Sequence, residues 1–174
     1  MHTYFCYVVF LLTITSPAQP LLSETQSSKP SVAIQNVMAG IKMISIPAGT
    51  FEMGSNWELH PKNPLRGKGF FKADQPVHTV TLSAFSMSAT EVTQGQYKAV
   101  IGTNPSRFTG DDNLPVERVS WRDAIRFCNA LSDKAGFMQC YDESTGSCDF
   151  TRNGFRLPTE AEPGRVVFRE QRGP

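Results

Sequence analysis

The stretch "SWRDAIRFCNALSDKAG" (residues 120–136) contains the strongest helix pattern in the sequence. Ser120 is a favoured N-cap residue, and the carboxylate of Asp123 completes a capping box and favours the positive end of the helix. Apolar residues then recur at the helical period: Trp121, Ala124, Ile125, Cys128 and Leu131. Gly136 is a typical C-terminal stop. We therefore predict a helix over 121–135 with one buried face.

Short strands precede this helix. Residues 78–88, "HTVTLSAFSMS", alternate between apolar and polar side chains. This pattern predicts one half-buried strand with Val80, Leu82 and Ala84 on its inner face. Residues 42–55, "KMISIPAGTFEMGS", predict two strands that are separated at Pro47–Gly49.

A second helix and long loops complete the pattern. Thr93 is a predicted N-cap, and the helix that it begins ends at Gly102. Residues 56–76 and 103–115 are rich in Pro, Gly, Asn and charged residues and predict loops. Loops of this length inside a domain are uncommon and often functional. Because no strand–helix–strand rhythm is present, we expect an irregular, loop-rich α+β domain.

The first 18 residues have the features of a secretory signal peptide. "YFCYVVFLLTI" (4–14) is continuously apolar but short for a membrane span, and Ser16 and Ala18 place small residues before a cleavage point. The segment lacks Lys and Arg before its apolar run, which leaves an anchor or a misassigned start as the alternative. We expect cleavage after Ala18, a secreted or periplasmic product without a membrane span, and a Ser-, Gln- and Pro-rich linker over 19–40.

Three cysteines follow the predicted leader. Cys128 lies on the apolar side of the predicted helix. Cys140 and Cys148 flank "YDESTGS", a turn-rich loop. In an exported protein this arrangement predicts a Cys140–Cys148 disulfide and a free, buried Cys128; two reduced thiols are the alternative. A single cysteine pair does not supply the four ligands of a structural zinc site.

The stretch "RLPTEAEPGRVV" (156–167) contains conflicting signals. Thr159 and Glu162 have the spacing of an N-cap and a reciprocal N3 residue, which predicts the start of a helix. Pro163 then lacks the N–H of the next position, and Gly164 weakens the helix further. The pattern therefore predicts a helix that begins and breaks within one turn.

Charge and motifs exclude several classes of function. The net charge is +1 and no basic run is present, so we expect no nucleic-acid partner. The sequence has no Gly-rich phosphate loop, no H-E-x-x-H and no G-x-S-x-G elbow. Glu91, just before the predicted helix cap at Thr93, is expected to support the helix start.

Four segments together resemble a known family: "IPAGTFEMGS", "HTVTLSAFSMSATEVTQGQY", "LPVERVSWRDAIRFCNALS" and "NGFRLPTEAE". Their order, from about residue 44 to Glu162, is similar to the amino-terminal half of the formylglycine-generating enzyme, or sulfatase-modifying factor, family. The resemblance implies an irregular fold like that of C-type lectins. It also assigns the conserved-looking positions to structural roles: Glu91, Ser120, Trp121, Asp123, Arg156, Thr159, Glu160 and Glu162.

The resemblance implies a chemistry whose residues lie beyond the matching region. Founding members oxidise a sulfatase cysteine to formylglycine, using oxygen and a copper ion held by two cysteines near the carboxyl end. Calcium ions hold loops in the same later half. None of the three cysteines here matches the copper pair, so no catalytic or metal-binding residue is carried over, and copper and calcium are expected only for full-length members.

The expectation is therefore a truncated family member. Residues 41–162 form a partial domain, and 163–174 resemble a tail read in a displaced frame. A full-length product acts on a sulfatase or another protein substrate, whereas this chain is expected to be inactive. The alternative is an exported, non-catalytic binding or accessory domain of the same fold.

Overall fold

The helix predicted at 121–135 is present in the computed structural model as α3 (Trp121–Ala135), with both predicted ends. The Ser120 hydroxyl accepts a hydrogen bond from the Asp123 N–H at 3.2 Å, and the Asp123 carboxylate accepts one from the Ser120 N–H at 3.1 Å. Gly136 adopts the left-handed conformation with a φ of 78°. A residue without a side chain adopts this conformation without strain, so the helix ends there.

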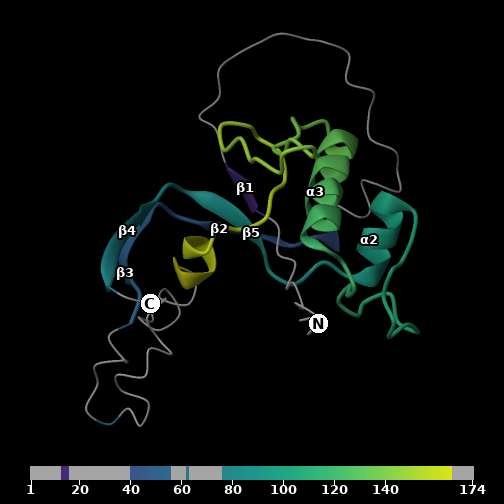
Figure 1. Ribbon diagram of the computed structural model, residues 1–174, viewed down its shortest axis with the longest axis horizontal. Coiled ribbons are helices and arrows are strands. Elements are labelled where there is room, and N and C mark those ends of the chain that lie inside the picture. The colour runs from purple at the N-terminus through teal and green to yellow at the C-terminus, as the bar shows by residue number, and fades with distance from the viewer. Residues whose placement is uncertain (1–12, 16–39, 56–61, 63–75, 166–174) are drawn as a thin grey trace. The chain divides into compact units, whose positions relative to one another are not determined.

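The structure describes residues 13–15, 40–55, 62 and 76–165 (Figure 1). These residues belong to two compact units. The first contains the described residues up to Ile46 together with 85–158. The second contains 47–84, where described, and the segment from Thr159 onward.

The first unit contains a three-stranded antiparallel sheet in the order β1-β5-β2. Its strands are β1 (Thr13–Thr15), β2 (Met43–Ile46) and β5 (Phe85–Ser88). The central strand β5 pairs with β2 through Phe85 and Ile46, and with β1 through Met87 and Thr13. Because β5 has neighbours on both edges, Phe85, Met87 and Ser88 are all buried.

Two helices of the first unit pack against each other. α2 (Gln94–Ile101) has the predicted Thr93 cap, which forms a reciprocal box with Gln96. The rings of Tyr97 on α2 and Phe127 on α3 stack with their centroids 5.3 Å apart. The apolar face of α3 contributes five buried residues to the core: Ala124, Ile125, Phe127, Cys128 and Leu131.

The prediction that Trp121 lies on the buried face of α3 is wrong. Its side chain is 46% exposed. The first turn of α3 extends past the core, and the indole packs edge-on against the ring of Tyr141, with centroids 6.4 Å apart. Phe127, which the predicted apolar stripe omitted, is fully buried instead because α2 covers that side of α3.

The second unit contains the antiparallel pair β3 (Gly49–Met53) and β4 (His78–Leu82). The single strand predicted over 78–88 is therefore divided, because β4 pairs with β3 whereas β5 belongs to the sheet of the first unit. Val80 and Leu82 are half-buried as expected, but Ala84 lies in the exposed connection between the two strands. A run of alternating residues cannot show which partner each half will pair with.

The helix predicted to break at Pro163 continues through it, over residues 161–165. Pro163 has no N–H to donate to the Thr159 carbonyl, as an α-helix requires at that position. The Glu162 N–H donates to that carbonyl instead, at 3.3 Å, and closes a tighter first turn. Gly164 lies beside the ring of the buried Phe51, where an added Cβ would stand 3.4 Å from a ring carbon. Packing on Phe51 therefore supports a helix that its local sequence disfavours.

Short strands, two helices and long irregular connections confirm the predicted loop-rich α+β class. Within the described part of the chain, none of the helices combines the length and apolar character that a bilayer crossing requires.

Candidate functional site

The carboxyl half of α3 holds an irregular loop, residues 140–152, through one buried asparagine. Asn129 is 1% exposed. Its amide nitrogen donates to the Tyr141 carbonyl at 2.9 Å and to a Glu143 carboxylate oxygen at 3.1 Å. Its amide oxygen accepts from the Tyr141 N–H at 3.1 Å. The side chain thus replaces a strand neighbour for Tyr141, whose backbone groups would otherwise be buried without partners.

Two aspartates fold the rest of this loop into turns. A carboxylate oxygen of Asp142 accepts bonds from the Ser144 hydroxyl at 2.6 Å and the Ser144 N–H at 2.8 Å. These bonds lower the pKa of Asp142 to about 2. Asp149 accepts equivalent bonds from Thr151, which lower the pKa of Asp149 as well. Both aspartates are therefore ionised turn-forming residues at neutral pH.

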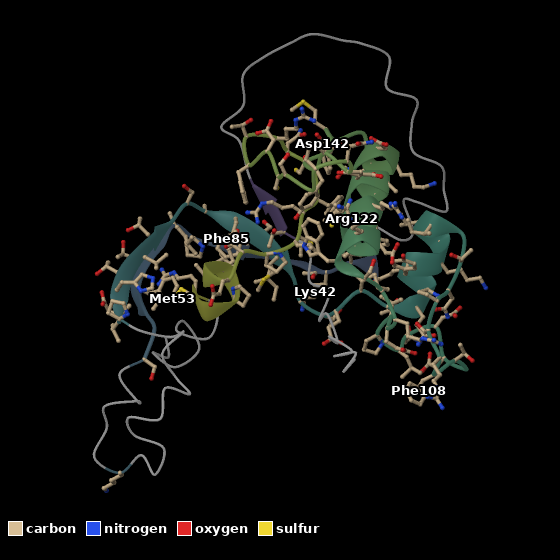
Figure 2. All side chains as sticks on the ribbon, viewed as in Figure 1. Lys42, Met53, Phe85, Phe108, Arg122 and Asp142 are labelled. Carbon is tan, nitrogen blue, oxygen red and sulfur yellow. The ribbon has the colours of Figure 1, made fainter. Side chains whose placement is uncertain are left out.

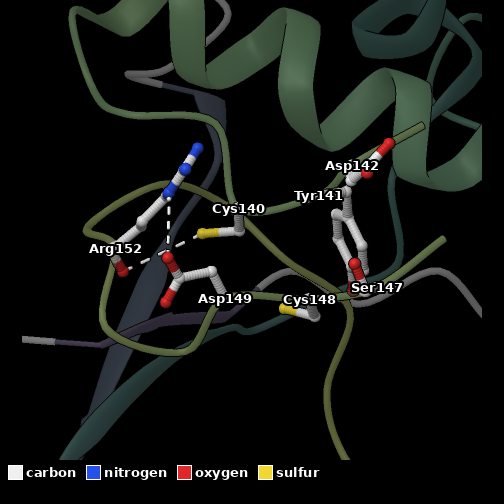
Figure 3. A pocket seen from close by; sticks show the side chains of 7 residues that line it. All are labelled: Cys140, Tyr141, Asp142, Ser147, Cys148, Asp149 and Arg152. Atoms are coloured by element: carbon white, nitrogen blue, oxygen red, sulfur yellow. Dashed lines mark hydrogen bonds and ion pairs between the residues drawn. The ribbon is translucent and has the colours of Figure 1, made fainter. Parts of the chain in front are cut away.

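These turns enclose a small pocket with a volume of about 210 Å³ (Figure 3). Its lining is polar apart from one ring and two thiols: Cys140, Tyr141, Asp142, Ser147, Cys148, Asp149 and Arg152. The Cys140 thiol donates to the Arg152 carbonyl at 3.8 Å, and the Arg152 guanidinium donates to Asp149 at 3.1 Å. The pocket is thus organised by bonds among its own lining residues.

The thiols around the pocket are poor nucleophiles. Burial raises the pKa of Cys140 and of Cys148, and raises the pKa of the fully buried Cys128 further. The hydroxyl of Tyr141 is bonded to the Leu157 N–H at 3.0 Å, and burial raises its pKa too. A reactive cysteine needs a lowered pKa and an electropositive surrounding. These groups are therefore neutral at physiological pH.

The predicted Cys140–Cys148 disulfide is not formed in this structure, in which Cys128, Cys140 and Cys148 are free thiols. Tyr141, rather than Cys140, lies opposite Cys148 in an antiparallel bridge. The pairing stays a prediction for the chain in an oxidising compartment.

A second candidate surface lies at the other end of the first unit, on the loop between α2 and α3. Phe108 is 61% exposed and projects from this loop (Figure 2). The buried Gln94 holds the loop from inside: its amide nitrogen donates to the carbonyls of Phe108 at 2.8 Å and Pro115 at 3.3 Å, and its oxygen accepts from Asn104 at 2.9 Å. The exposed Phe108 ring thus belongs to a loop whose backbone carbonyls are hydrogen-bonded to the buried Gln94.

Additional bonds hold the same loop from its outer side. A carboxylate oxygen of Glu117 accepts the backbone N–H groups of Arg107 and Phe108. The Arg107 guanidinium lies 5.8 Å from the centroid of the Phe108 ring, within the range of a cation–π contact. Sequence reasoning predicted this segment only as a loop, because Gln94 looks like an ordinary first-turn residue.

Most of the residues assigned to structural roles take part in caps or backbone pairing. Ser120 and Asp123 form the cap of α3. Arg156 is buried, pairs through its backbone with Thr13 and places its guanidinium 5.0 Å from the Phe150 ring centroid. The cap of α2 comes from Thr93 and Gln96, and Glu91 takes no part in it.

The predicted cap at Thr159 is half present. The Glu162 carboxylate accepts the Thr159 N–H at 2.7 Å, as the capping box requires, and Glu162 is buried. The Thr159 hydroxyl, however, is buried without a hydrogen-bond partner among the described residues, so it caps nothing. Glu160 is exposed at the start of this helical turn.

The donors of the described residues do not fit the metals that the resemblance implies. No group of three or more His, Cys, Asp or Glu side chains is placed to hold a metal ion in that part of the chain. Copper bound by cysteines must displace the thiol protons, and burial, which raises the pKa of Cys140 and of Cys148, opposes that step. No acidic cluster of the kind that calcium prefers is present there either.

Known proteins show where this fold recurs. "Chaperone protein LppX" of Paenibacillus barcinonensis is 40% identical over 114 residues, which cover 54% of this chain and 40% of the relative. The structure titled "Treponema denticola variable protein 1" is 34% identical, with a TM-score of 0.57, over 70% of this chain and 50% of that one. "Crystal Structure of CarF" is 27% identical, with a TM-score of 0.47, over 70% and 54%.

The chain therefore spans half or less of the length of the relative and of the variable protein. The profile of the sulfatase-modifying factor enzyme 1-like domain matches residues 29–164, which is most of the sequence. The fold agrees, since the structure of the variable protein matches 70% of this chain, a loop-rich arrangement of short strands and capped helices. The chain belongs to the sulfatase-modifying factor enzyme 1-like domain family.

Proposed function

We propose that this chain is an exported, non-catalytic binding domain, and that the loop carrying Phe108 contacts a protein partner. The observation that carries this proposal is the exposed Phe108 ring on a loop fixed by Gln94 and Glu117. Aromatic and arginine side chains on rigid backbones dominate the binding energy of protein interfaces, and Arg107 lies beside the ring.

The loop also satisfies a physical requirement for tight binding. Ordering a mobile loop at an interface costs free energy, whereas a loop that is already bonded to its scaffold avoids most of that cost. Leu114, on the same loop, and Ile101, at the end of α2, are also exposed, at 40% and 36%. A relative is named "Chaperone protein LppX", and a protein partner for this chain is consistent with that name.

Formylglycine generation is the second candidate, because the family resemblance implies it. The neutral thiols around the pocket oppose it for this chain. The purified chain, supplied with copper, oxygen and a cysteine-containing sulfatase peptide, is expected to form no aldehyde. Aldehyde formation that depends on Cys140 or Cys148 would establish the oxidase instead.

The binding proposal is tested with a photo-crosslinking amino acid in place of Phe108 in the cell that exports the protein. We expect one discrete adduct, identified by mass spectrometry. Phe150 is the matched control, because it is 52% exposed in the same unit but lies on the pocket side. With the captured partner in hand, Phe108→Ala should weaken binding by at least about tenfold, whereas Phe150→Ala should not. Equal capture from both positions, or equal affinities, contradicts the proposal.

A further inference from the structure

One edge of the first sheet is formed by residues from outside the matched family domain. β1 pairs with β5, with Thr13 opposite Met87. On its other side, the Thr13 N–H donates to the Arg156 carbonyl at 2.8 Å, and the Arg156 N–H donates to the Thr13 carbonyl at 3.0 Å. Thr13 therefore lies between two segments that are distant in sequence, β5 and the backbone at Arg156. Figure 1 shows β1 beside β5.

This position, which we name the strand slot, is buried and polar. Thr13 is fully buried, and Arg156 and Met87 are 3% and 7% exposed. The Thr13 hydroxyl lies 3.3 Å from the Arg156 carbonyl oxygen and 3.4 Å from that of Leu157. Without a strand in the slot, the N–H and carbonyl groups of Arg156 would lose their bonds to Thr13, and an incoming strand could restore them.

The strand that fills the slot belongs to the predicted leader. The family match begins at residue 29, whereas β1 ends at Thr15, and cleavage after Ala18 would remove it. We propose that the strand slot is a strand-acceptor site: the leader fills it before cleavage, and an extended segment of a partner protein fills it afterwards. The site is separate from the Phe108 loop and does not depend on the function assigned to that loop.

The occupant is defined by the contacts of β1. It runs antiparallel to β5, and it carries Thr or Ser at the position of Thr13, because the carbonyls of Arg156 and Leu157 lie within reach of a hydroxyl there. A strand added to a sheet edge gains affinity from main-chain hydrogen bonds and specificity from alternate side chains. A second copy of this chain is a poorer occupant, because β2 to β5 are already paired with each other and the copy would bring another open slot.

The first experiment follows the Arg156 amide by hydrogen exchange in the full 174-residue chain with a protease site between Ala18 and Gln19. We expect strong protection before cleavage and at least about tenfold faster exchange after cleavage and removal of the leader. In the uncut chain, Thr13→Pro removes the N–H that bonds to the Arg156 carbonyl. The strand should then pair less tightly, and exchange of the Arg156 amide, which bonds to the carbonyl of residue 13, should also become faster. In both cases amides of α3 should stay protected. Unchanged exchange at Arg156 in either form overturns the proposal.

The second experiment adds a solubilised synthetic peptide of residues 9–18 to the cut chain. We expect saturable binding that restores protection at Arg156. A peptide with Thr13→Ser should bind as well as the parent peptide, because it keeps the hydroxyl. A peptide with Thr13→Val, which loses the hydroxyl bond, should bind about threefold more weakly. A peptide with Thr13→Pro, which also loses the N–H bond, should bind at least about tenfold more weakly. Absence of binding to a cut chain whose α3 is still protected refutes the site. Dimerisation of the cut chain that restores protection without peptide refutes the partner strand.

Discussion

Asn129 is the residue whose replacement tests the candidate pocket most directly. Asn129→Ala removes all three bonds that join α3 to Tyr141 and Glu143. Two of them satisfy the backbone N–H and carbonyl of Tyr141, which is only 8% exposed. A buried backbone group left without a partner costs about 1–2 kcal/mol, so the two together lower the free energy of unfolding by about 2–4 kcal/mol. The third bond reaches the exposed Glu143 and adds little.

The expected loss corresponds to a melting temperature lower by roughly 5–15 °C for a chain of this size. Urea denaturation, monitored by circular dichroism, measures the loss in the free energy of unfolding. The rate of alkylation of Cys140 measures how accessible the pocket is. Cys140 is 2% exposed, so it should react slowly in the parent and markedly faster in the variant. The control is Asp133→Ala on the same helix, where the side chain is exposed and accepts one bond from Gln139. A loss below about 1 kcal/mol without faster alkylation would show that water satisfies Tyr141 and that Asn129 does not hold the loop.

Three further predictions concern single groups. Hydrogen bonds lower the pKa of Asp142 from 3.8 to about 2, so its contribution to stability is present above about pH 4 and is lost as the pH falls toward 2. Asp142→Asn should therefore flatten the pH dependence of the free energy of unfolding between about pH 4 and 2. An unchanged slope in that window contradicts the prediction. Thr159→Val should leave stability unchanged or raise it by up to about 1 kcal/mol in urea denaturation, because the buried hydroxyl has no partner among the described residues, and a clear loss would reveal one. Peptide mapping of the exported chain under non-reducing conditions should find Cys140 linked to Cys148 and Cys128 free; two free thiols at 140 and 148 reject the pairing.

Features set by neighbouring residues were predictable from the sequence. The capping box of α3 needs only Ser120 and Asp123, and both helices end at glycines with positive φ. Features set by distant residues were not. Gln94 organises the Phe108 loop through carbonyls 14 and 21 residues further along, and nothing in its local pattern distinguishes it from a solvent-exposed glutamine.

The helix across Pro163 shows how a correct local argument leads to a wrong boundary. Proline does remove the bond to the Thr159 carbonyl, and glycine does weaken a helix. The Thr159 carbonyl nevertheless accepts the Glu162 N–H, and Gly164 lies beside the Phe51 ring, where an added Cβ would make ordinary van der Waals contact. Pro163 and Gly164 are therefore unfavourable for an isolated helix but compatible with a helical turn beside the Phe51 ring of β3.

Thr13 presents the converse case, in which one local pattern serves two purposes. The apolar run that precedes it has the composition of a leader, and that composition is also the one a buried strand needs. Sequence composition alone cannot separate the two, because the pairing of Thr13 with Met87 and Arg156 exists only in the folded chain. If both descriptions hold, the precursor is a complete sheet and the processed chain is an incomplete one. Export then removes the strand that pairs with Arg156, and binding an extended partner becomes a consequence of processing itself.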